Sequence, residues 1–455
     1  MSLFKEISAF LTPGQVSANP SILDQHSKDE SYHPPVLPDL VVFPESREDV
    51  VRVLSYANAY GIPIVPFGAG SGLEGHVVPV RHGVSLDMSR MNRILEVRPE
   101  DFLVRVQPGV TRKQLNEELR RYGLFFPVDP GADATLGGMT ATNASGTTTV
   151  RYGAMRENVR ALEVVLANGS IIHTGSLAVK SSSGYNLTAL LVGSEGTLGV
   201  FTELWLRIYG LPEKTIAARA EFPDIESCVR TSTAIVGAGI PVARVEFVDA
   251  EMMAAVNKYK ETNYRLTPTL FFEFRGSDKS VENDVELSKE IAFEDGCLSF
   301  VFETAEESRN QLWEARHSAA HAFMHQYPGL GHMATDVCVP LSKLPEAVTR
   351  AKELLTSMGL KGAMVGHVGD GNFHTSLAFN PKNPDELDLA NRYSEQLVYH
   401  ALELGGTCTG EHGVGLGKKK YQQKEHGTSL EVMRALKQVF DPNRILNPGK
   451  LVDED

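Results

Sequence analysis

The chain has 455 residues, of which 42% are hydrophobic and 22% are charged, and its formal net charge is −13 at pH 7. This is the composition of an ordinary globular chain with room for about three domains, and the acidic balance argues against a nucleic-acid-binding surface. The sequence has no apolar run of about 18 residues, so no transmembrane segment is expected, and residues 1–6 do not resemble a signal peptide.

A β-α-β unit is expected near the N-terminus, after a helical arm and loop over residues 1–35. Residues 40–44 are typical of a short strand, and the capping-box pattern from Ser46 to Asp49 predicts the start of a helix. Gly61 predicts the end of that helix, and the next strand is expected over residues 62–66.

Further strands are expected over residues 84–88, 94–97, 103–106 and 200–208. Thr111 is expected to cap a helix that ends near Gly123. The pair Asn168-Gly169 lies between two apolar runs and predicts a type I′ hairpin turn.

The character of the sequence changes around Pro212. Strand-like segments at 216–222, 243–248, 269–274 and 298–302 alternate there with helical ones, which predicts an α+β domain. Long helices are expected over 384–404 and 431–440. His317, His321 and His325 are four residues apart, and we expect them to form a solvated or partly packed stripe on one helix.

The segment 66–75 contains the pattern G-x-G-x-x-G, but a dinucleotide-binding site of the Rossmann type requires a helix directly after it. The following residues, 76–80, are more typical of a strand, so that interpretation is rejected. A glycine-rich loop can still bind phosphate through successive backbone N–H groups, although it can also be a simple bend. Small residues gather again at 127–153 and 193–199, where the backbone could approach a large flat ligand.

The segments 366–374 and 410–413 together predict a metal centre. Asp370-Gly371 is a strong two-residue hairpin signal, and such a turn would place His367 opposite His374 with Cβ atoms about 5 Å apart. With Glu411 they form a set of three ligands that leaves positions open on a divalent ion. Zinc is expected first, while manganese and iron also suit these ligands. The alternative is a polar cross-strand pair without metal.

The order of these loops resembles the vanillyl-alcohol-oxidase (PCMH-type) flavoprotein family, and within it the cytochrome-type D-lactate dehydrogenases. The motifs that carry the resemblance are 335–340, 366–374, 406–413, 441–442 and 447–450, and the similarity extends from about residue 38 to 451. It implies an α+β fold with two lobes, an FAD-binding lobe and a cap lobe. The chain is expected to divide into four segments: an N-terminal arm (1–35), a PCMH-type FAD-binding domain (36–211), an α+β, ferredoxin-like cap domain (212–408) and a C-terminal helical segment (409–455) that returns to the FAD domain.

The resemblance also implies FAD, and because no residue can be assigned as a covalent attachment point, we expect the flavin to be bound non-covalently. The pyrophosphate would lie on Pro66, Phe67, Gly68, Ala69, Gly70, Ser71 and Gly72. The dinucleotide and isoalloxazine would contact Pro130, Asp133, Thr135, Gly138, Asn143, Gly146 and Tyr152, and the adenosine end would meet Glu195, Gly196, Gly199 and Val200. Asn447 would close the ring pocket.

The activity implied is oxidation of D-lactate or a similar short D-2-hydroxy acid, with His412 as the general base. Arg316 is expected to bind the substrate carboxylate, unless it is a surface arginine, and Asn372 is a second substrate candidate. Relatives that accept 2-hydroxyglutarate tend to carry lysine where this chain has Ala334, which favours a monocarboxylate. Glycolate and D-2-hydroxyglutarate remain alternatives. So do a flavin-dependent group-transfer enzyme of the ether-lipid synthase type and a non-enzymatic flavin and metal regulatory protein.

The expected partners are the small hydroxy acid and an external electron acceptor, which would be cytochrome c, a quinone or an electron-transfer flavoprotein. The four cysteines are scattered and form no C-x-x-C pattern, which favours a reducing compartment. A cytoplasmic protein is expected, with peripheral membrane attachment left open, and the oligomeric state is not predicted.

Overall fold

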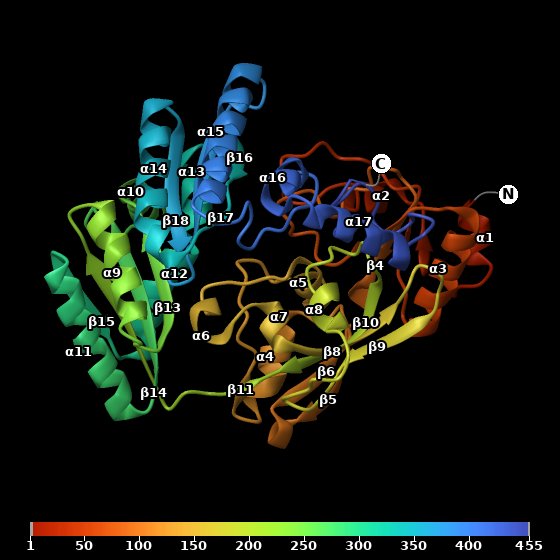
Figure 1. Cartoon of the computed structure of the whole chain (residues 1–455), viewed down its shortest axis with the longest axis horizontal. Helices are drawn as coiled ribbons and strands as arrows, with labels where there is room; N and C mark the ends of the chain where they lie inside the picture. Colours follow the sequence, from red (N-terminus) through yellow and green to blue (C-terminus); the bar gives the residue numbers. More distant parts are fainter. Residues whose placement is uncertain (1–2, 454–455) are drawn as a thin grey trace. The chain divides into compact units, whose positions relative to one another are not determined.

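The structure is a computed structural model that describes residues 3–453. Met1 and Ser2, where the expected N-terminal arm starts, and Glu454 and Asp455 lie outside the described residues. The chain forms two compact units, and each is described by itself (Figure 1). The first unit comprises Met1–Ser145, Gly153–Leu211 and Glu411–Asp455, and the second comprises Gly146–Tyr152 and Pro212–Gly410.

The first unit begins with a four-stranded sheet in the order β1 (Val16–Ser17), β2 (Leu40–Val42), β4 (Val84–Asp87) and β3 (Ile64–Phe67). Helix α3 (Arg47–Tyr60) connects β2 to β3, and both strands run parallel to β4, which lies between them. The expected capping box is present: the Ser46 side chain accepts from Asp49 N–H, and the Asp49 carboxylate accepts from Ser46 N–H. Gly61 ends the helix with a φ of 67°.

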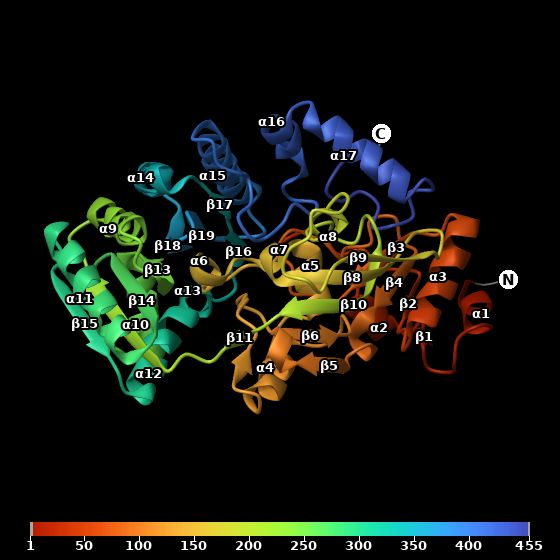
Figure 2. The ribbon, with the colours of Figure 1, turned by 60° about the horizontal axis from the view of Figure 1, so that its bottom comes forward.

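The helical arm consists of α1 (Leu3–Ser8) and α2 (Pro20–Gln25). Helices α1 and α3 lie side by side in Figures 1 and 2. Ile7 of α1 is buried in the same apolar cluster as Val50 and Leu54 of α3. Apolar contact therefore attaches the arm to the first sheet.

A second, antiparallel sheet follows in the order β5 (Ile94–Arg98), β6 (Leu103–Val106), β10 (Val200–Arg207), β8 (Val159–Val165) and β9 (Ile171–Gly175). Helix α4 (Arg112–Arg120) begins at the predicted cap, where Thr111 accepts from Gln114 N–H. The β8–β9 hairpin is confirmed, but the predicted type I′ turn is wrong. Gly169 has a φ of 81° while Asn168 is not among the residues with positive φ, and the loop spans five residues, 166–170. The Asn168 side chain accepts from Ser170 N–H instead, which stabilises this longer loop.

Short elements complete the first unit: η1 (Met88–Arg90), η2 (Pro99–Asp101), β7 (Leu124–Phe125), α5 (Leu136–Thr142), α7 (Met155–Asn158), α8 (Leu187–Leu191), β11 (Tyr209–Gly210), η4 (Lys419–Tyr421), α16 (Gln422–His426) and α17 (Ser429–Phe440). The strand expected over residues 76–80 is wrong, because this described segment forms turns. No helix follows it within residues 76–83 either, as the rejection of a Rossmann site requires.

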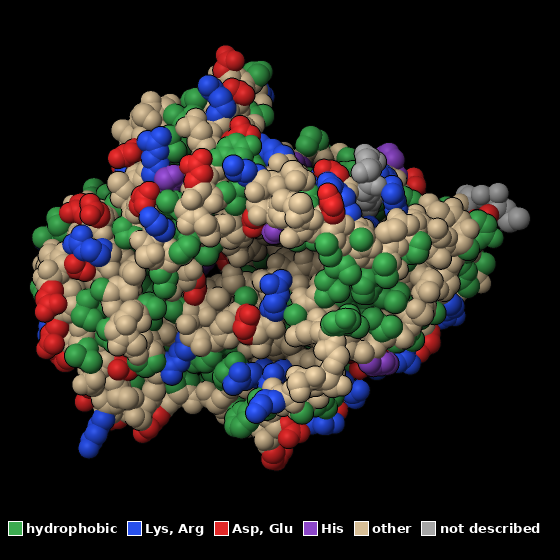
Figure 3. Space-filling view, in the orientation of Figure 1, with side chains coloured by type: hydrophobic (Ala, Val, Ile, Leu, Met, Phe, Trp, Pro, Cys, Tyr) green, Lys and Arg blue, Asp and Glu red, His purple; other side chains and the backbone are tan. Residues whose placement is uncertain are grey.

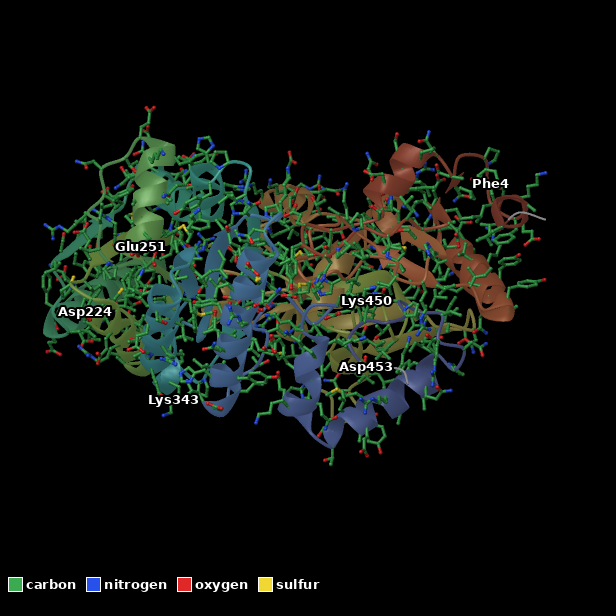
Figure 4. All side chains as sticks on the ribbon, turned by 90° about the horizontal axis from the view of Figure 1, so that it is seen from above. Phe4, Asp224, Glu251, Lys343, Lys450 and Asp453 are labelled. Atoms are coloured by element: carbon green, nitrogen blue, oxygen red, sulfur yellow. The ribbon has the colours of Figure 1, made fainter. Side chains whose placement is uncertain are left out.

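The C-terminal tail is held by two buried lysines. Lys437 donates from Nζ to Asp441 at 2.6 Å, to Leu446 O at 2.7 Å and to Thr197 O at 2.9 Å. Lys450, labelled in Figure 4, is buried and donates to Val78 O at 2.6 Å. On the surface, Figure 3 shows apolar side chains gathered near α8 and α17. Val432 and Val439 of α17 are both exposed.

The second unit is built on an antiparallel eight-stranded sheet. Its order is β15 (Ser299–Glu303), β12 (Lys214–Glu221), β14 (Thr269–Gly276), β13 (Val242–Val248), β18 (Lys361–His367), β19 (Asn372–Phe379) and β16 (Gly331–Ala334), with β17 (Val337–Cys338) also paired to β19. Helices α9 (Ile225–Gly237), α11 (Asp278–Glu294) and α14 (Leu344–Ser357) cover one face, and α10 (Ala250–Lys260), α12 (Glu306–His317) and α13 (Ala319–Gln326) cover the other (Figure 2).

Two further helices belong to this unit, α15 (Pro384–Glu403) and the short α6 (Thr149–Tyr152), which contacts β13. The three histidines expected on one helix are divided, because Ser318 separates α12 from α13. His317 ends α12 and stacks on Trp313, whereas His325 lies in α13 against Tyr259. The expected single helix is therefore wrong, but all three histidines are exposed, as expected of a solvated or partly packed stripe. Among residues 3–453, no helix combines the length and the apolar character needed to cross a lipid bilayer.

Candidate active site

A pocket in the first unit is lined mainly by glycines and other small residues from separate loops. Ten residues expected to hold FAD line it: Pro66, Phe67, Gly68, Thr135, Gly138, Glu195, Gly196, Gly199, Val200 and Asn447. Eight residues that were not expected line it as well: His76, Val77, Met88, Pro108, Gly137, Ala141, Thr142 and Phe201. The loops that the sequence analysis singled out therefore meet around one cavity.

Other expected cofactor residues of the first unit are not part of this lining: Ala69, Gly70, Ser71, Gly72, Pro130, Asp133 and Asn143. The side chain of Asn143 is used within the protein, where it accepts from Arg156 N–H at 2.9 Å. Gly146 and Tyr152 belong to the second unit.

The glycines of the pocket allow very close approach of the chain. A Cβ at Gly68 would lie 2.5 Å from Oγ1 of Thr135, and one at Gly137 would lie 2.5 Å from Cβ of Pro108. Gly196 has a φ of 71°, a conformation that other residues rarely adopt. Backbone-lined walls of this kind, with apolar side chains between them, fit a large flat cofactor with a phosphate linkage.

The carboxylate of Glu195 is engaged inside the first unit. It accepts from Val414 N–H at 2.7 Å and from Gly415 N–H at 2.9 Å, and it lies 3.5 Å from Nε2 of His76. That last distance is long for a hydrogen bond, so the contact with His76 is mainly an ion pair. Burial alone would raise the pKa of Glu195, but His76 and the two N–H groups outweigh it and lower that pKa.

The loop that begins at Glu411 is held against the pocket wall by these contacts. Glu411 Oε2 accepts from the Ser145 hydroxyl at 3.1 Å. Asn447 donates to the carbonyls of Glu195 and His76 at 2.7 and 3.0 Å, which joins the C-terminal tail to the same wall. Glu411 and the expected base, His412, therefore lie on a loop whose position is set by buried polar contacts.

The expected histidine pair lies in the β18–β19 hairpin of the second unit, but in a different register. The pairs are His367 with Asn372 and Val365 with His374, and the loop 368–371 has four residues instead of two. The predicted turn is therefore wrong. The observed register differs from the expected one by two residues. Because side chains alternate between faces with a period of two, His367 and His374 remain on one face of the sheet as diagonal neighbours. Their ring centroids are 5.4 Å apart.

Both imidazoles are held through Nδ1. His367 Nδ1 lies 2.8 Å from Glu246 Oε1, and His374 Nδ1 lies 3.1 Å from the carbonyl of Thr335. Both partners are acceptors, so each Nδ1 carries the proton and each Nε2 keeps a lone pair. This is how histidines that bind metals are usually oriented.

Glu411 follows Gly410, the last residue of the second unit, whose N–H donates to the buried Asp336 carboxylate at 2.8 Å. His367 and His374 lie in the second unit, whereas Glu411 is the first residue of the C-terminal part of the first unit. Two imidazole nitrogens and a carboxylate oxygen are a ligand set that suits zinc, manganese or ferrous iron.

The expected substrate residues are both buried. Arg316, at the end of α12, donates from Nη2 to Glu246 Oε2 at 2.5 Å, so it is not a surface arginine. Asn372 donates from Nδ2 to Asp336 at 2.7 Å and to Val337 O at 2.8 Å. Its side-chain oxygen has no hydrogen-bond partner among the described residues.

Comparison with known proteins shows which protein family this chain belongs to. Residues 38–175 match the model of the FAD binding domain, and residues 211–451 match the model of the C-terminal domain of FAD linked oxidases. The chain belongs to the FAD-linked oxidases. The expected family and the FAD-binding domain are thereby confirmed.

Two curated relatives are similar over most of their length. "Probable D-lactate dehydrogenase, mitochondrial" from Danio rerio is 48% identical over 96% of this chain and 89% of its own. "D-lactate dehydrogenase [cytochrome], mitochondrial" from Arabidopsis thaliana is 44% identical over 94% of this chain and 76% of its own. The structure of p-cresol methylhydroxylase with bound substrate has a TM-score of 0.80 at 20% identity and covers 98% of this chain and 95% of that one. This confirms the expected PCMH-type fold.

Two charged residues near these sites were not found from the sequence. Glu246 lies in the run Val245 to Val248, and a charge inside a buried strand was the signal that could have revealed it. His76 carried no comparable signal. Its environment depends on Glu195 and Gly413, which are distant in the sequence.

Proposed function

We propose that the chain oxidises D-lactate, or a similar short D-2-hydroxy acid, to the 2-oxo acid and passes the electrons to an external acceptor. Two relatives at 48% and 44% identity are named as D-lactate dehydrogenases. The observation that carries the proposal is the histidine pair on one hairpin, with the Nδ1 atom of each imidazole held by an acceptor. This arrangement suits activation of a hydroxyl group next to a carboxylate.

His367, His374 and Glu411 would hold a divalent ion, with zinc first and manganese or ferrous iron as alternatives. A bound ion of this kind lowers the pKa of a coordinated hydroxyl group. His412 directly follows Glu411, and its Nε2 lies 4.0 Å from Glu411 Oε1. We assign to His412 the removal of the hydroxyl proton, because an imidazole has an ordinary pKa suited to this task near neutral pH.

Arg316 would bind the substrate carboxylate. Glu246 engages Nη2, and Nε of Arg316 is a buried N–H without a hydrogen-bond partner among residues 3–453. A buried donor of this kind is costly unless a ligand supplies an acceptor. Asn372 would contribute its side-chain oxygen to a substrate hydroxyl or to a water molecule.

FAD, bound non-covalently at the pocket of the first unit, would supply the hydride acceptor. Pro66, Gly68 and Gly196, which line this pocket, would contact it. Ala334 favours a monocarboxylate because it offers no charge to a second carboxylate. None of the described cysteines forms a disulfide. The cytoplasm remains a prediction, since both relatives carry the word mitochondrial in their names.

Anaerobic mixing of the purified protein with D-lactate, L-lactate, D-2-hydroxybutyrate and glycolate tests the proposal by the loss of flavin absorbance. We expect D-lactate to bleach the flavin and L-lactate not to do so. His412→Ala should slow bleaching by about 10²-fold or more, the usual scale for loss of a general base, with FAD content unchanged. His426→Ala, which changes a half-buried histidine of α16, is the matched control. The proposal is wrong if none of the D-hydroxy acids or glycolate reduces the flavin.

A further inference from the structure

Glu246 is a fully buried carboxylate in the middle of β13, on the sheet face that α10, α12 and α13 cover. Strand β13 pairs with β18 through Phe247 with Gly366 and Val248 with Val365, and the same register places Glu246 opposite His367. Burying an ionised carboxylate is costly unless hydrogen bonds and opposite charge compensate it. A glutamate at this position therefore needs partners.

Each oxygen of Glu246 has a partner from a different element. Oε1 accepts from His367 Nδ1 at 2.8 Å, and Oε2 accepts from Arg316 Nη2 at 2.5 Å. Because a carboxylate can only accept, the proton of His367 is held on Nδ1 and the lone pair on Nε2. The guanidinium of Arg316 is held by the same group, so the orientations of these two side chains depend on one residue.

His367 and His374 differ in the group that accepts the hydrogen bond from Nδ1. His374 donates from Nδ1 to a backbone carbonyl, that of Thr335, and its Nδ1 lies 3.6 Å from the Asp336 carboxylate. His367 donates directly to a carboxylate, which makes an imidazole more basic toward a metal than a carbonyl does. Removing Glu246 should therefore weaken metal binding through His367 and release Arg316 at the same time.

We propose that Glu246 is a positioning residue that sets the affinity of His367 for the metal and holds Arg316 for the substrate carboxylate. The inference deepens the proposed function and rests on it, because it requires a metal at His367 and His374. It connects the metal ligand and the substrate-binding residue through one carboxylate, so a change at Glu246 affects metal affinity and substrate KM together.

The test is a titration of metal-free protein, still loaded with FAD, with Zn²⁺ and Mn²⁺ in wild type and Glu246→Gln. Loss of a group that supports a metal ligand typically weakens metal affinity by about 10- to 100-fold, and we expect a weakening in that range. The KM for D-lactate should rise in the same variant. Arg316→Met should raise KM while leaving the metal dissociation constant within about twofold of wild type, since His367 keeps its carboxylate.

The matched control is Glu273→Gln. Glu273 is a buried glutamate of β14 on the same face, where it pairs with Arg244 at 3.2 Å and Arg275 at 2.5 Å. Both variants remove one buried charge from this sheet. Metal affinity should fall in Glu246→Gln and stay at the wild-type value in Glu273→Gln. If Glu246→Gln does not fold, Glu246→Asp replaces it, because the shorter side chain cannot reach both partners and should also weaken metal binding.

His374→Ala separates this inference from the proposed function. Wild-type metal affinity in Glu246→Gln or Glu246→Asp, together with its loss in His374→Ala, would overturn the role of Glu246 and leave the metal site intact. Equal weakening in the Glu246 and Glu273 variants would overturn it too, because a general loss of stability would then explain both. Absence of metal binding by the wild type would overturn the metal part of the proposed function, and this inference with it.

Discussion

Replacing Glu195 by glutamine should loosen the loop that carries Glu411 and His412. The Glu195 carboxylate accepts from Val414 N–H at 2.7 Å and from Gly415 N–H at 2.9 Å, and both contacts are buried. Glutamine has one acceptor oxygen, so it can serve only one of these donors and turns its own NH₂ group toward the other. The loop should therefore keep its fold and lose part of its attachment.

The size of the effect follows from these two bonds. A hydrogen bond to a charged group contributes about 1.5–3 kcal/mol, and a buried donor left without an acceptor costs about 1–3 kcal/mol. Losing one bond and weakening the other should destabilise the attachment by at least about 2 kcal/mol, and every 1.4 kcal/mol is a factor of ten in an equilibrium constant. Amide protection at residues 414 and 415 should therefore fall by about 30-fold.

Hydrogen–deuterium exchange of the FAD-loaded protein measures this directly. Glu203→Gln is the control, since Glu203 lies in β10 of the same unit and contacts Arg105 at 3.4 Å without touching the loop. We also expect Glu195→Gln to reduce the flavin more slowly with D-lactate while retaining FAD. Wild-type protection of the amides of Val414 and Gly415 in this variant would refute the reasoning.

The contact between Glu195 and His76 predicts that the stability of the protein depends on pH. Burial alone would lower the pKa of His76, but the Glu195 carboxylate outweighs it and the pKa is raised above its ordinary 6.5; the pKa of Glu195 is lowered below its ordinary 4.5. The His76 contribution to stability is complete below 6.5 and is lost as the pH rises through its folded pKa. The Glu195 contribution is present above 4.5 and is lost as the pH falls through its folded pKa. Wild type should thus lose thermal stability from pH 6 to 9 by an increment that Glu195→Gln lacks.

Three further predictions concern stability. Gly371→Ala should lower the melting temperature of the protein far more than Gly359→Ala. Both glycines have positive φ, but a Cβ at residue 371 would lie 2.1 Å from Val339 O, whereas one at residue 359 would meet open space. Equal melting temperatures would contradict this. Ser46→Ala should lower the unfolding free energy in urea by about 1 kcal/mol, with an unchanged m-value, and no loss would show that the cap contributes nothing. Lys437→Met leaves a buried aspartate without its cation and should cost about 3–5 kcal/mol, seen as faster proteolysis of the C-terminal tail; a wild-type cleavage rate would argue against it.

Local patterns were enough to predict helix ends and most strands. The capping box at Ser46 and the helix end at Gly61 depend on contacts between residues within one or two turns. A short stretch of sequence is therefore enough to predict them. The family was also readable, since its glycine loops and paired histidine motifs are contiguous in the sequence. The substrate, the metal ligands and the base stay predictions, because no contact within the chain tests what a ligand would touch.

The β18–β19 hairpin is a feature that the local sequence did not predict correctly. Asp370-Gly371 predicts a two-residue turn, yet the loop has four residues, because β17 and the close approach of Gly371 to Val339 O hold it in that form. The histidines stayed on one face only because the slip was even. A slip of one residue would have separated them.

From the sequence alone came the two-lobed α+β fold, the FAD-binding family and the residue types gathered at each site. Tertiary structure decided what holds those residues: Glu246 behind His367 and Arg316, Glu195 beneath residues 414 and 415, and Asn447 between two carbonyls. The reason is physical. A buried carboxylate or amide is stabilised by partners that lie tens to hundreds of residues away in the sequence. The pairing of strands and loops that brings these partners together cannot be predicted from any short stretch of sequence.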